Sequence, residues 1–335
     1  MSGTAEGSHA PHRPAACSVI WDSAQASALG TAPAARFWVA LEQNGPWGRE
    51  AATQSHLDPE VGMALSRACQ EAEGRFMLIR RPGAHSDAHE RGPQRVYLAG
   101  GLADRSWLLQ ADLDDPARLL RLPWAALGDG DIAAVQDTVP EFGQSPTPVL
   151  LVCANSRRDV CCAVRGRPVA RESSAQRPGQ VWECSHTGGH RFAPTGVLLP
   201  LGQTFARLSG TSAVAAIDAA TRGEVPLELL GSAYDRGRSH LSPPAQAAES
   251  LVRQQIQEPS LNALSTAAAP QPGRENAWQC RVSHVDGRHW DVVAVRESGG
   301  DDRPESCGKA PVPTWQWSLL SGSVPSGSVL GGFGR

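Results

Sequence analysis

The sequence predicts a mixed α/β (α+β) fold made of two similar halves and a small C-terminal β-hairpin region. One order of strands and helices occurs twice before residue 225, and a strong hairpin signal follows near residue 286. Composition agrees with this organisation: 41% of the 335 residues are hydrophobic and 19% are charged. A chain of this length and composition can form two globular domains of ordinary size.

The first half is expected to contain a strand, a helix, a strand, a hairpin and a short helix. These elements are predicted at residues 36–43, 58–73, 75–81, 95–101 with 106–113, and 116–127. The segment Asn-Gly-Pro-Trp-Gly at 44–48 forms a turn after the first strand, and we expect Trp47 to anchor that turn as a buried aromatic.

The second half repeats this order. Its strand, helix, strand, hairpin and helix are predicted at residues 149–153, 159–171, 180–184, 196–201 with 203–208, and 212–222. This order is a thioredoxin-like layout, so its repetition indicates an internal duplication. In such folds a cis-proline often precedes a strand, and Pro194 occupies that place.

Beyond residue 223 the pattern changes. We expect an amphipathic helix at 243–257, a Pro/Ala-rich linker at 267–273, and a hairpin of residues 278–284 and 289–296 around Asp286-Gly287. The predicted division of the chain is a mobile tail, two thioredoxin-like domains, a helix with a linker, a small β region and a second mobile tail. Their boundaries are 1–16, 17–146, 147–225, 226–275, 276–320 and 321–335.

Four potential metal ligands gather in the second half: Cys153, Cys162, His186 and His190. Two thiols and two imidazoles are enough to close a tetrahedral zinc site or to hold an iron–sulfur cluster. A strand–helix–strand crossover makes its two strands parallel, so their C-terminal ends, which carry Cys153 and His186, meet at one edge. Cys162 is predicted in the first turns of the intervening helix, where the helix dipole favours a thiolate.

The two glycines between the histidines, Gly188 and Gly189, remove side-chain bulk so that both imidazoles can face one metal. Cys161 competes with Cys162 for the second position. Because neighbouring helical residues point about 100° apart, only one of them can face the site easily.

Residues 153–168 and 181–195 resemble the sucrase/ferredoxin-like family, as do residues 44–48 and 304–308. The resemblance covers most of 17–318. It implies that 147–225 is a thioredoxin-like ferredoxin domain and that a 2Fe–2S cluster is held by two cysteines with eight residues between them and by both histidines of His-x-Gly-Gly-His. In this chain those ligands are Cys153, Cys162, His186 and His190, so Cys161 is expected to be a packed, inert thiol. Sugar chemistry is not implied, and we do not expect a sucrase. The repeated layout makes 17–146 a degenerate copy, since no cysteine pair follows its first strand.

Ligation by two imidazoles makes such a cluster less negative than ligation by four thiolates and raises its reduction potential. If an imidazole N–H is exposed, the potential is expected to fall as pH rises through the imidazole range. Four arginines close in sequence would stabilise the reduced state if they approach the cluster, although solvated surface charges are the commoner fate of arginine. They are Arg157, Arg158, Arg165 and Arg191.

Two other functions use the same region. A structural zinc protein could employ the same four ligands, and a thiol oxidoreductase could use the vicinal pair Cys161 and Cys162, although the usual Cys-x-x-Cys is absent. Core packing is the default expectation for the remaining cysteines: Cys17, Cys69, Cys184, Cys280 and Cys307. His85 and His89 repeat the spacing of the proposed ligands, but no cysteine pair accompanies them, and we expect an incidental polar loop.

The remaining sequence features limit the class of protein that this chain can be. A net charge of −3 argues against a nucleic-acid binder, and no run of eighteen apolar residues predicts a membrane helix. The N-terminus has no apolar segment typical of a secretory signal, and eight sparse cysteines favour reduced thiols in the cytoplasm. No glycine-rich dinucleotide motif follows a predicted strand, so we expect an electron carrier served by an external redox protein, in preference to a substrate-converting enzyme.

Overall fold

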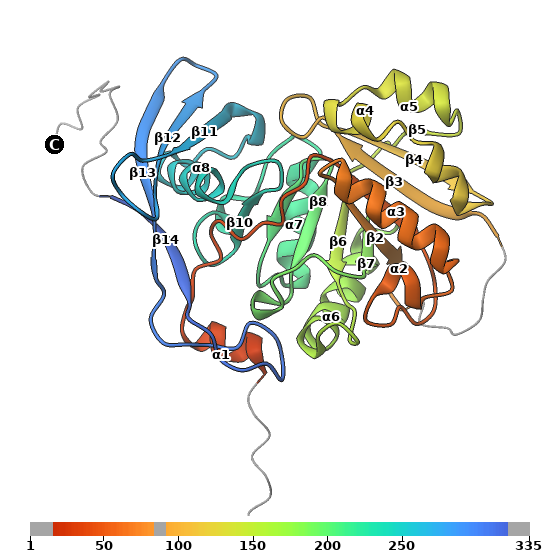
Figure 1. Ribbon diagram of the computed structural model, residues 1–335, viewed down its shortest axis with the longest axis horizontal. Helices are drawn as coiled ribbons and strands as arrows, with labels where there is room; N and C mark the ends of the chain where they lie inside the picture. The colour runs from red at the N-terminus through yellow and green to blue at the C-terminus, as the bar shows by residue number, and fades with distance from the viewer. Residues whose placement is uncertain (1–15, 84–91, 321–335) are drawn as a thin grey trace, which may run out of the picture.

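A computed structural model describes residues 16–83 and 92–320 and shows the mixed α/β fold with two β-sheets (Figure 1). The predicted mobile tails, apart from residue 16, and the predicted loop with His85 and His89 lie outside these residues. The strands of the first sheet are β1 (Trp38–Glu42), β2 (Arg75–Arg80), β3 (Gln94–Gly100), β4 (Trp107–Leu113), β5 (Gly143–Gln144), β6 (Val149–Cys153), β7 (Val181–Cys184), β8 (Gly196–Leu199), β9 (Gln203–Phe205) and β10 (Asp235–Arg238).

The two predicted halves have the same strand connectivity. In the first half β1 pairs parallel with β2 and antiparallel with β3, which pairs antiparallel with β4. In the second half β6 pairs parallel with β7 and antiparallel with β8, which pairs antiparallel with β9. The repeated order predicted from the sequence is thus confirmed at the level of strand pairing.

The halves meet edge to edge through β2 and β7. These strands pair antiparallel, with Ile79 opposite Cys184 and Arg80 opposite Glu183, and they join both halves into one sheet of order β10-β9-β8-β6-β7-β2-β1-β3-β4-β5. Because one sheet runs through both halves, the division into two separate domains stays a prediction.

The helices that complete each half begin where capping residues stand. Asp58 accepts hydrogen bonds from the first turn of α3 (Pro59–Glu71), Asp159 does so for α6 (Val160–Gln176), and Ser209 forms a capping box with Ser212 at α7 (Gly210–Ala220). In the Asp159 cap, Oδ1 accepts from the backbone N–H of Cys161 at 2.8 Å. This cap fixes the first turn of α6, which carries Cys161 and Cys162.

One predicted helix is wrong in detail. The single helix expected at 116–127 is split into the 3₁₀ helix η1 (Pro116–Arg121) and helix α4 (Trp124–Asp129). Pro123 lies between them and has no backbone N–H to continue the helical hydrogen bonds. Six further helices of the described residues were not predicted: α1 (Cys17–Ser23), α2 (Ala51–Gln54), α5 (Ile132–Thr138) and the 3₁₀ helices η2 (His190–Phe192), η3 (Leu227–Leu229) and η4 (Leu261–Ala263).

The C-terminal region forms a second, antiparallel sheet of β11 (Leu264–Pro270), β12 (Ala277–His284), β13 (His289–Ser298) and β14 (Trp315–Leu319). The predicted hairpin is confirmed as β12 paired with β13. Helix α8 (Pro243–Ile256) packs its Ala248 and Val252 against this sheet. The linker expected at 267–273 is wrong over its first residues, since Ala267 to Pro270 belong to β11; β12 supplies the hydrogen-bond partners, and Pro270 stands at the strand end.

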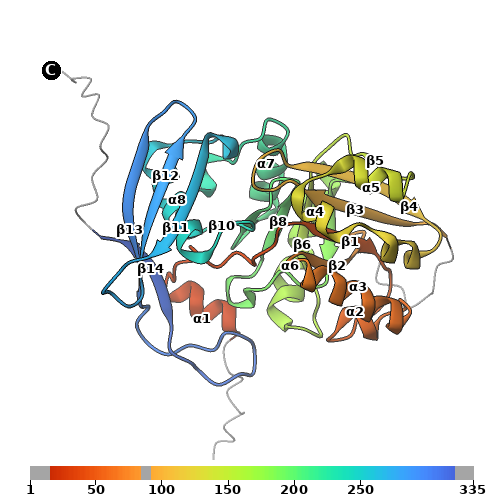
Figure 2. The same ribbon diagram turned by 45° about the horizontal axis from the view of Figure 1, so that its top comes forward.

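Helix α1 lies far from the other N-terminal elements. In Figures 1 and 2 it sits beside the loop that precedes β14, and it contacts the short 3₁₀ helix η2 (His190–Phe192), so α1 and the loop before β14 meet close to α6. Within residues 16–83 and 92–320, no helix is both long and apolar enough to cross a membrane.

Candidate metal centre

The four predicted ligands lie together at one edge of the first sheet. Cys153 ends β6, Cys162 is in the first turn of α6, His186 lies two residues after β7, and His190 begins η2. Cys162 Sγ is 3.1 Å from His190 Nδ1, and the rings of His186 and His190 stack with centroids 4.8 Å apart. The side chains of Cys162 and His186 interact with the thiol of Cys153. The structure therefore places all four residues on the side of the sheet that the sequence predicts, with direct contacts between Cys162 and His190 and between the two imidazole rings.

The electrostatics of the two thiols are opposite. The hydrogen bond from Cys162 lowers the pKa of Cys153 well below its ordinary value, and the His186 side chain adds to this effect against the cost of burial. The same shared proton, together with burial, raises the pKa of Cys162 well above its ordinary value. The first thiolate of the pair therefore forms at Cys153.

The site is closed on its protein side and open at its histidines. Cys153 and Cys162 are fully buried, whereas His186 and His190 are half-buried. Burial lowers the pKa of His190, which keeps its imidazole in the neutral form that binds metals. A hollow of about 160 Å³ at the surface is lined by His186 and, among others, Glu50 and Arg158. The imidazoles thus form the part of the site that solvent or another protein can reach.

The loop between the histidines needs both of its glycines. Gly188 and Gly189 each have φ of 72°, a conformation that side chains other than glycine rarely adopt. At Gly189 a β-carbon would also lie 2.7 Å from an amino nitrogen of Arg236. The predicted reason for this pair of glycines, close backbone packing between two ligands, applies most directly to Gly189.

Arg236 is a component of the site that the sequence did not suggest. Its side chain is 1% exposed, donates hydrogen bonds to Gly188 O at 3.2 Å and to Thr31, and forms no ion pair with a carboxylate of the described residues. Burial lowers its pKa to about 9, so it stays charged at neutral pH, and thiolate charge on Cys153 favours that charge. Arg236 lies far beyond His190 in the sequence, and no local sequence pattern indicates that it belongs to the site.

The four arginines named from the sequence are placed differently. Three are neutralised by carboxylates: Arg158 pairs with Glu50 at 2.5 Å, Arg165 with Asp22 at 2.6 Å, and Arg191 with Glu305 at 3.1 Å. Arg157 is exposed. Arg157, Arg158 and Arg165 thus behave as charges at or near the surface, whereas Arg191 is largely buried and its charge is offset by Glu305.

The donor set suits either of two occupants. Two thiols and two imidazoles can close a tetrahedral zinc site, and they can hold a 2Fe–2S cluster. Cys184 lies opposite Cys153 on the neighbouring strand, but burial raises its pKa well above the ordinary value, as expected of a packed thiol. The remaining cysteine of α6, Cys161, points away from this centre.

Cys161 belongs to a second group that could hold a metal ion. It lies with Cys17, Cys307 and Asp159, and the ligand atoms of all four residues are within 4.8 Å of one another. The expected packing of Cys17, Cys161 and Cys307 agrees with their burial in one small cluster with Ala193, but the sequence did not predict that the three thiols lie together. These residues come together through tertiary contacts between α1, the loop before β14 and α6.

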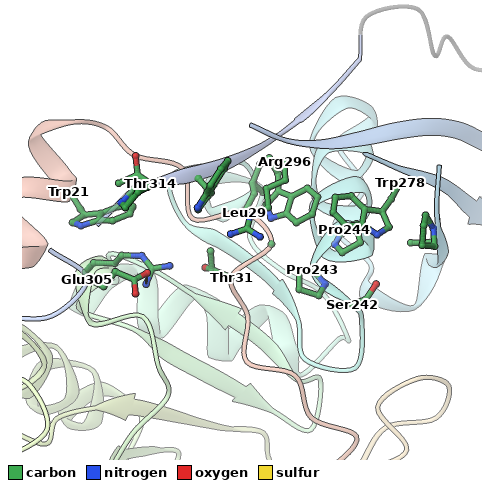
Figure 3. Close-up of a pocket in the computed structure, with 17 residues that line it drawn as sticks. Trp21, Leu29, Thr31, Ser242, Pro243, Pro244, Trp278, Arg296, Glu305 and Thr314 are labelled. Atoms are coloured by element: carbon green, nitrogen blue, oxygen red, sulfur yellow. Dashed lines mark ion pairs between the residues drawn. The ribbon is translucent and has the colours of Figure 1, made fainter. Parts of the chain in front are cut away.

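A separate cavity of about 660 Å³ lies between the N-terminal segment, the start of α8 and the C-terminal sheet (Figure 3). Tryptophans line much of it, and the ion pair of Arg191 and Glu305 stands at one end, beside Trp21. None of the four predicted ligands is among the described residues that line it. The cavity is therefore distinct from the candidate metal centre.

Comparison with known proteins shows the family of this chain. The chain matches no curated protein and no solved structure. The family model described as sucrase/ferredoxin-like matches residues 28–229, which include both sheet halves and all four predicted ligands. Since this match spans more than half of the chain, the protein belongs to the sucrase/ferredoxin-like family.

Proposed function

We propose that this protein is an electron carrier that holds a 2Fe–2S cluster with Cys153, Cys162, His186 and His190. The observation that carries the proposal is the convergence of two fully buried thiols and two half-buried imidazoles at one sheet edge. When bound, such a cluster would supply one-electron transfer at a potential raised by its imidazole ligands.

The residues of the chain have separate roles in this proposal. Cys153 and Cys162 anchor the metal in the dry interior, and Cys153 is the more readily deprotonated of these two thiols. His186 and His190 lie on the accessible side and are the ligands that a redox partner would approach. We expect that partner to be a separate protein, and we place the reaction in the cytoplasm, where the eight cysteines, all free here, would stay reduced.

The two alternatives use the same region differently. Structural zinc at the same four ligands fits the donor set equally well and differs in metal content. A thiol oxidoreductase would need Cys161 and Cys162 to act as a pair, but Cys162 contacts His190 whereas Cys161 contacts Cys17 and Cys307. These separate contacts favour a metal centre over a vicinal dithiol.

The test is a visible absorption and electron paramagnetic resonance spectrum of the full chain purified without air, before and after reduction with dithionite. A coloured sample with a paramagnetic signal of the imidazole-ligated type after reduction supports the proposal. A colourless protein that takes up zinc at these ligands, after iron and sulfide reconstitution has failed, would replace electron transfer by a structural role.

Replacing Arg236 by glutamine is expected to lower the reduction potential of the cluster. The reduced cluster carries one more negative charge, and a buried cation near it favours that state. A unit charge on the order of 10 Å from a cluster, at an effective dielectric constant of about 20, would contribute about 1.7 kcal/mol, or about 70 mV for one electron. Redox titration of the holoprotein measures the change.

Two variants control for this effect. Arg236→Lys keeps the positive charge and is expected to restore most of the potential, whereas Arg157→Gln removes a charge from an exposed side chain and is expected to change it little. An Arg236→Gln potential equal to that of the unaltered protein would mean that the guanidinium only supports the Gly188 loop.

A further inference from the structure

Three cysteines from distant parts of the chain form a compact triangle of sulfur atoms. Cys17 lies in α1, Cys161 in the first turn of α6, and Cys307 in the loop before β14. Their Sγ atoms are 3.5 Å apart for Cys17 and Cys161, 3.1 Å for Cys161 and Cys307, and 3.6 Å for Cys17 and Cys307. All three are free thiols. Thiols are weak hydrogen-bond donors and acceptors, so hydrogen bonding alone gives little reason to collect three of them.

The size of the triangle matches the thiolate face of a tetrahedral metal site. Zinc–sulfur bonds of about 2.3 Å in tetrahedral geometry place sulfur atoms about 3.8 Å apart, whereas a disulfide requires about 2.05 Å. The observed separations are close to the first value, and the sulfurs need to move apart by less than about 1 Å to accept the ion.

Asp159 supplies a fourth potential ligand beside the three sulfurs, a carboxylate oxygen. Its Oδ2 is 4.0 Å from Cys17 Sγ and accepts hydrogen bonds from Ser306 Oγ at 2.6 Å and from the backbone N–H of Cys307 at 2.8 Å. Its Oδ1 accepts from the N–H of Cys161. The carboxylate is therefore held in place by the two segments that carry Cys161 and Cys307, as supporting hydrogen bonds commonly hold metal ligands.

The group is enclosed, with one accessible side. Cys17, Cys161 and Asp159 are 1%, 2% and 4% exposed, and Cys307 is half-buried. Adjacent residues of a helix point about 100° apart, which directs Cys161 towards α1 while Cys162 faces His190. The triangle is thus separate from the candidate cluster ligands, and a metal ion could enter past Cys307.

We propose that Cys17, Cys161, Cys307 and Asp159 bind one zinc ion as a second, structural metal site. Thiolate ligands select zinc over calcium or magnesium, and four protein ligands leave no open position for catalysis. Each thiol that binds the ion releases its proton to solvent, so binding releases up to three protons. The ion fastens α1 and the loop before β14, both outside the family match at 28–229, onto α6.

Metal analysis of the full chain tests the proposal. Protein purified without air is supplemented with zinc chloride, freed of loose metal by gel filtration, and analysed for zinc and iron. We expect one zinc ion per chain in the unaltered protein, loss of that zinc in Cys17→Ala and Cys307→Ala with iron unchanged, and full zinc in Cys69→Ala. Cys69 is an equally buried cysteine that lies in a different core cluster.

X-ray absorption at the zinc edge of the unaltered protein tests the ligands without any variant. Three sulfur neighbours at about 2.3 Å and one oxygen neighbour, with no imidazole, are expected. Zinc with imidazole neighbours that is lost in Cys162→Ala would place the ion at the other four ligands and overturn the proposal. It is also overturned if zinc is absent, or if mass spectrometry of the protein purified without air shows a disulfide between Cys161 and Cys307. Iron content distinguishes each of these failures from a failure of the electron-carrier proposal.

Discussion

Replacing Cys153 or Cys162 by alanine is expected to abolish the visible colour of the protein and its paramagnetic signal after reduction. Each substitution removes a fully buried thiolate ligand, and no nearby side chain can replace it without moving the strand end or the first turn of α6. Iron and sulfide analysis and the absorption spectrum measure the loss. We expect at least a tenfold fall in bound iron, which corresponds to more than about 1.4 kcal/mol in binding.

Cys184→Ala is the matched control for these ligand variants. Cys184 is as buried as Cys153 and lies opposite it on β7, so its replacement removes a thiol of the same environment from the same sheet edge. Full colour in Cys184→Ala and none in Cys153→Ala would assign the ligand role to the specific cysteine. Retention of iron in both Cys153→Ala and Cys162→Ala would instead show that these two thiols are not ligands.

Cys161→Ala separates the remaining functions. The electron-carrier proposal expects this variant to keep its cluster, and the structural zinc proposed for Cys161 expects it to lose zinc. A thiol oxidoreductase with Cys161 and Cys162 as its redox pair would lose all activity without any change in iron. Comparing metal content with thiol-exchange activity in this one variant distinguishes the three.

The candidate centre could be predicted because its positions follow from local pattern and one topological rule. A buried apolar run ends at Cys153, a helix begins near Cys162, and a second strand ends just before His186. Parallel strands joined by a helix put those points at one edge. From the sequence alone it was therefore possible to predict that residues far apart along the chain lie close together.

The thiol triangle could not be predicted in this way. Cys17 and Cys161 are 144 positions apart, and Cys161 and Cys307 are 146 apart. No strand order or helical period connects α1 with the loop before β14, and each cysteine read alone is best explained as packing. Arg236 escaped notice for the same reason, because it approaches the histidine loop through β10, a short strand with no distinctive pattern.

The junction of the two halves was also hidden from the sequence. No pattern in the sequence marks Arg80 and Glu183 as partners, but β2 and β7 meet in the middle of the sheet and bury both. Repetition of a thioredoxin-like unit predicts two similar sheets, yet it does not say which edges join. The joining edge depends on side chains such as these, whose partners lie in the other half.

Replacing Glu183 by glutamine is expected to lower the free energy of unfolding by about 3–5 kcal/mol, because it leaves the Arg80 guanidinium buried beside a neutral group. Arg80 and Glu183 are 4% and 1% exposed, and Arg80 Nε donates to Glu183 Oε2 at 2.9 Å. Arg80 also donates to Gly45 O at 3.0 Å and lies 4.0 Å above the ring of Trp47, the buried anchor of its turn. The pair thus couples the β2–β7 junction to the turn after β1.

Urea unfolding of Glu183→Gln and of Asp112→Asn compares the free energy of unfolding that is lost in a buried ion pair with that lost in an exposed one. Arg95 and Asp112 also stand directly opposite on antiparallel strands of the same sheet, with a 2.6 Å contact, but the Asp112 side chain is 51% exposed. An exposed pair of this kind contributes about 0–1 kcal/mol. Replacing both Arg80 and Glu183 by methionine should cost less than the sum of the single losses, since no unpaired charge remains buried. Equal losses in Glu183→Gln and Asp112→Asn would mean that water reaches the β2–β7 junction and that this ion pair does not hold the two halves together.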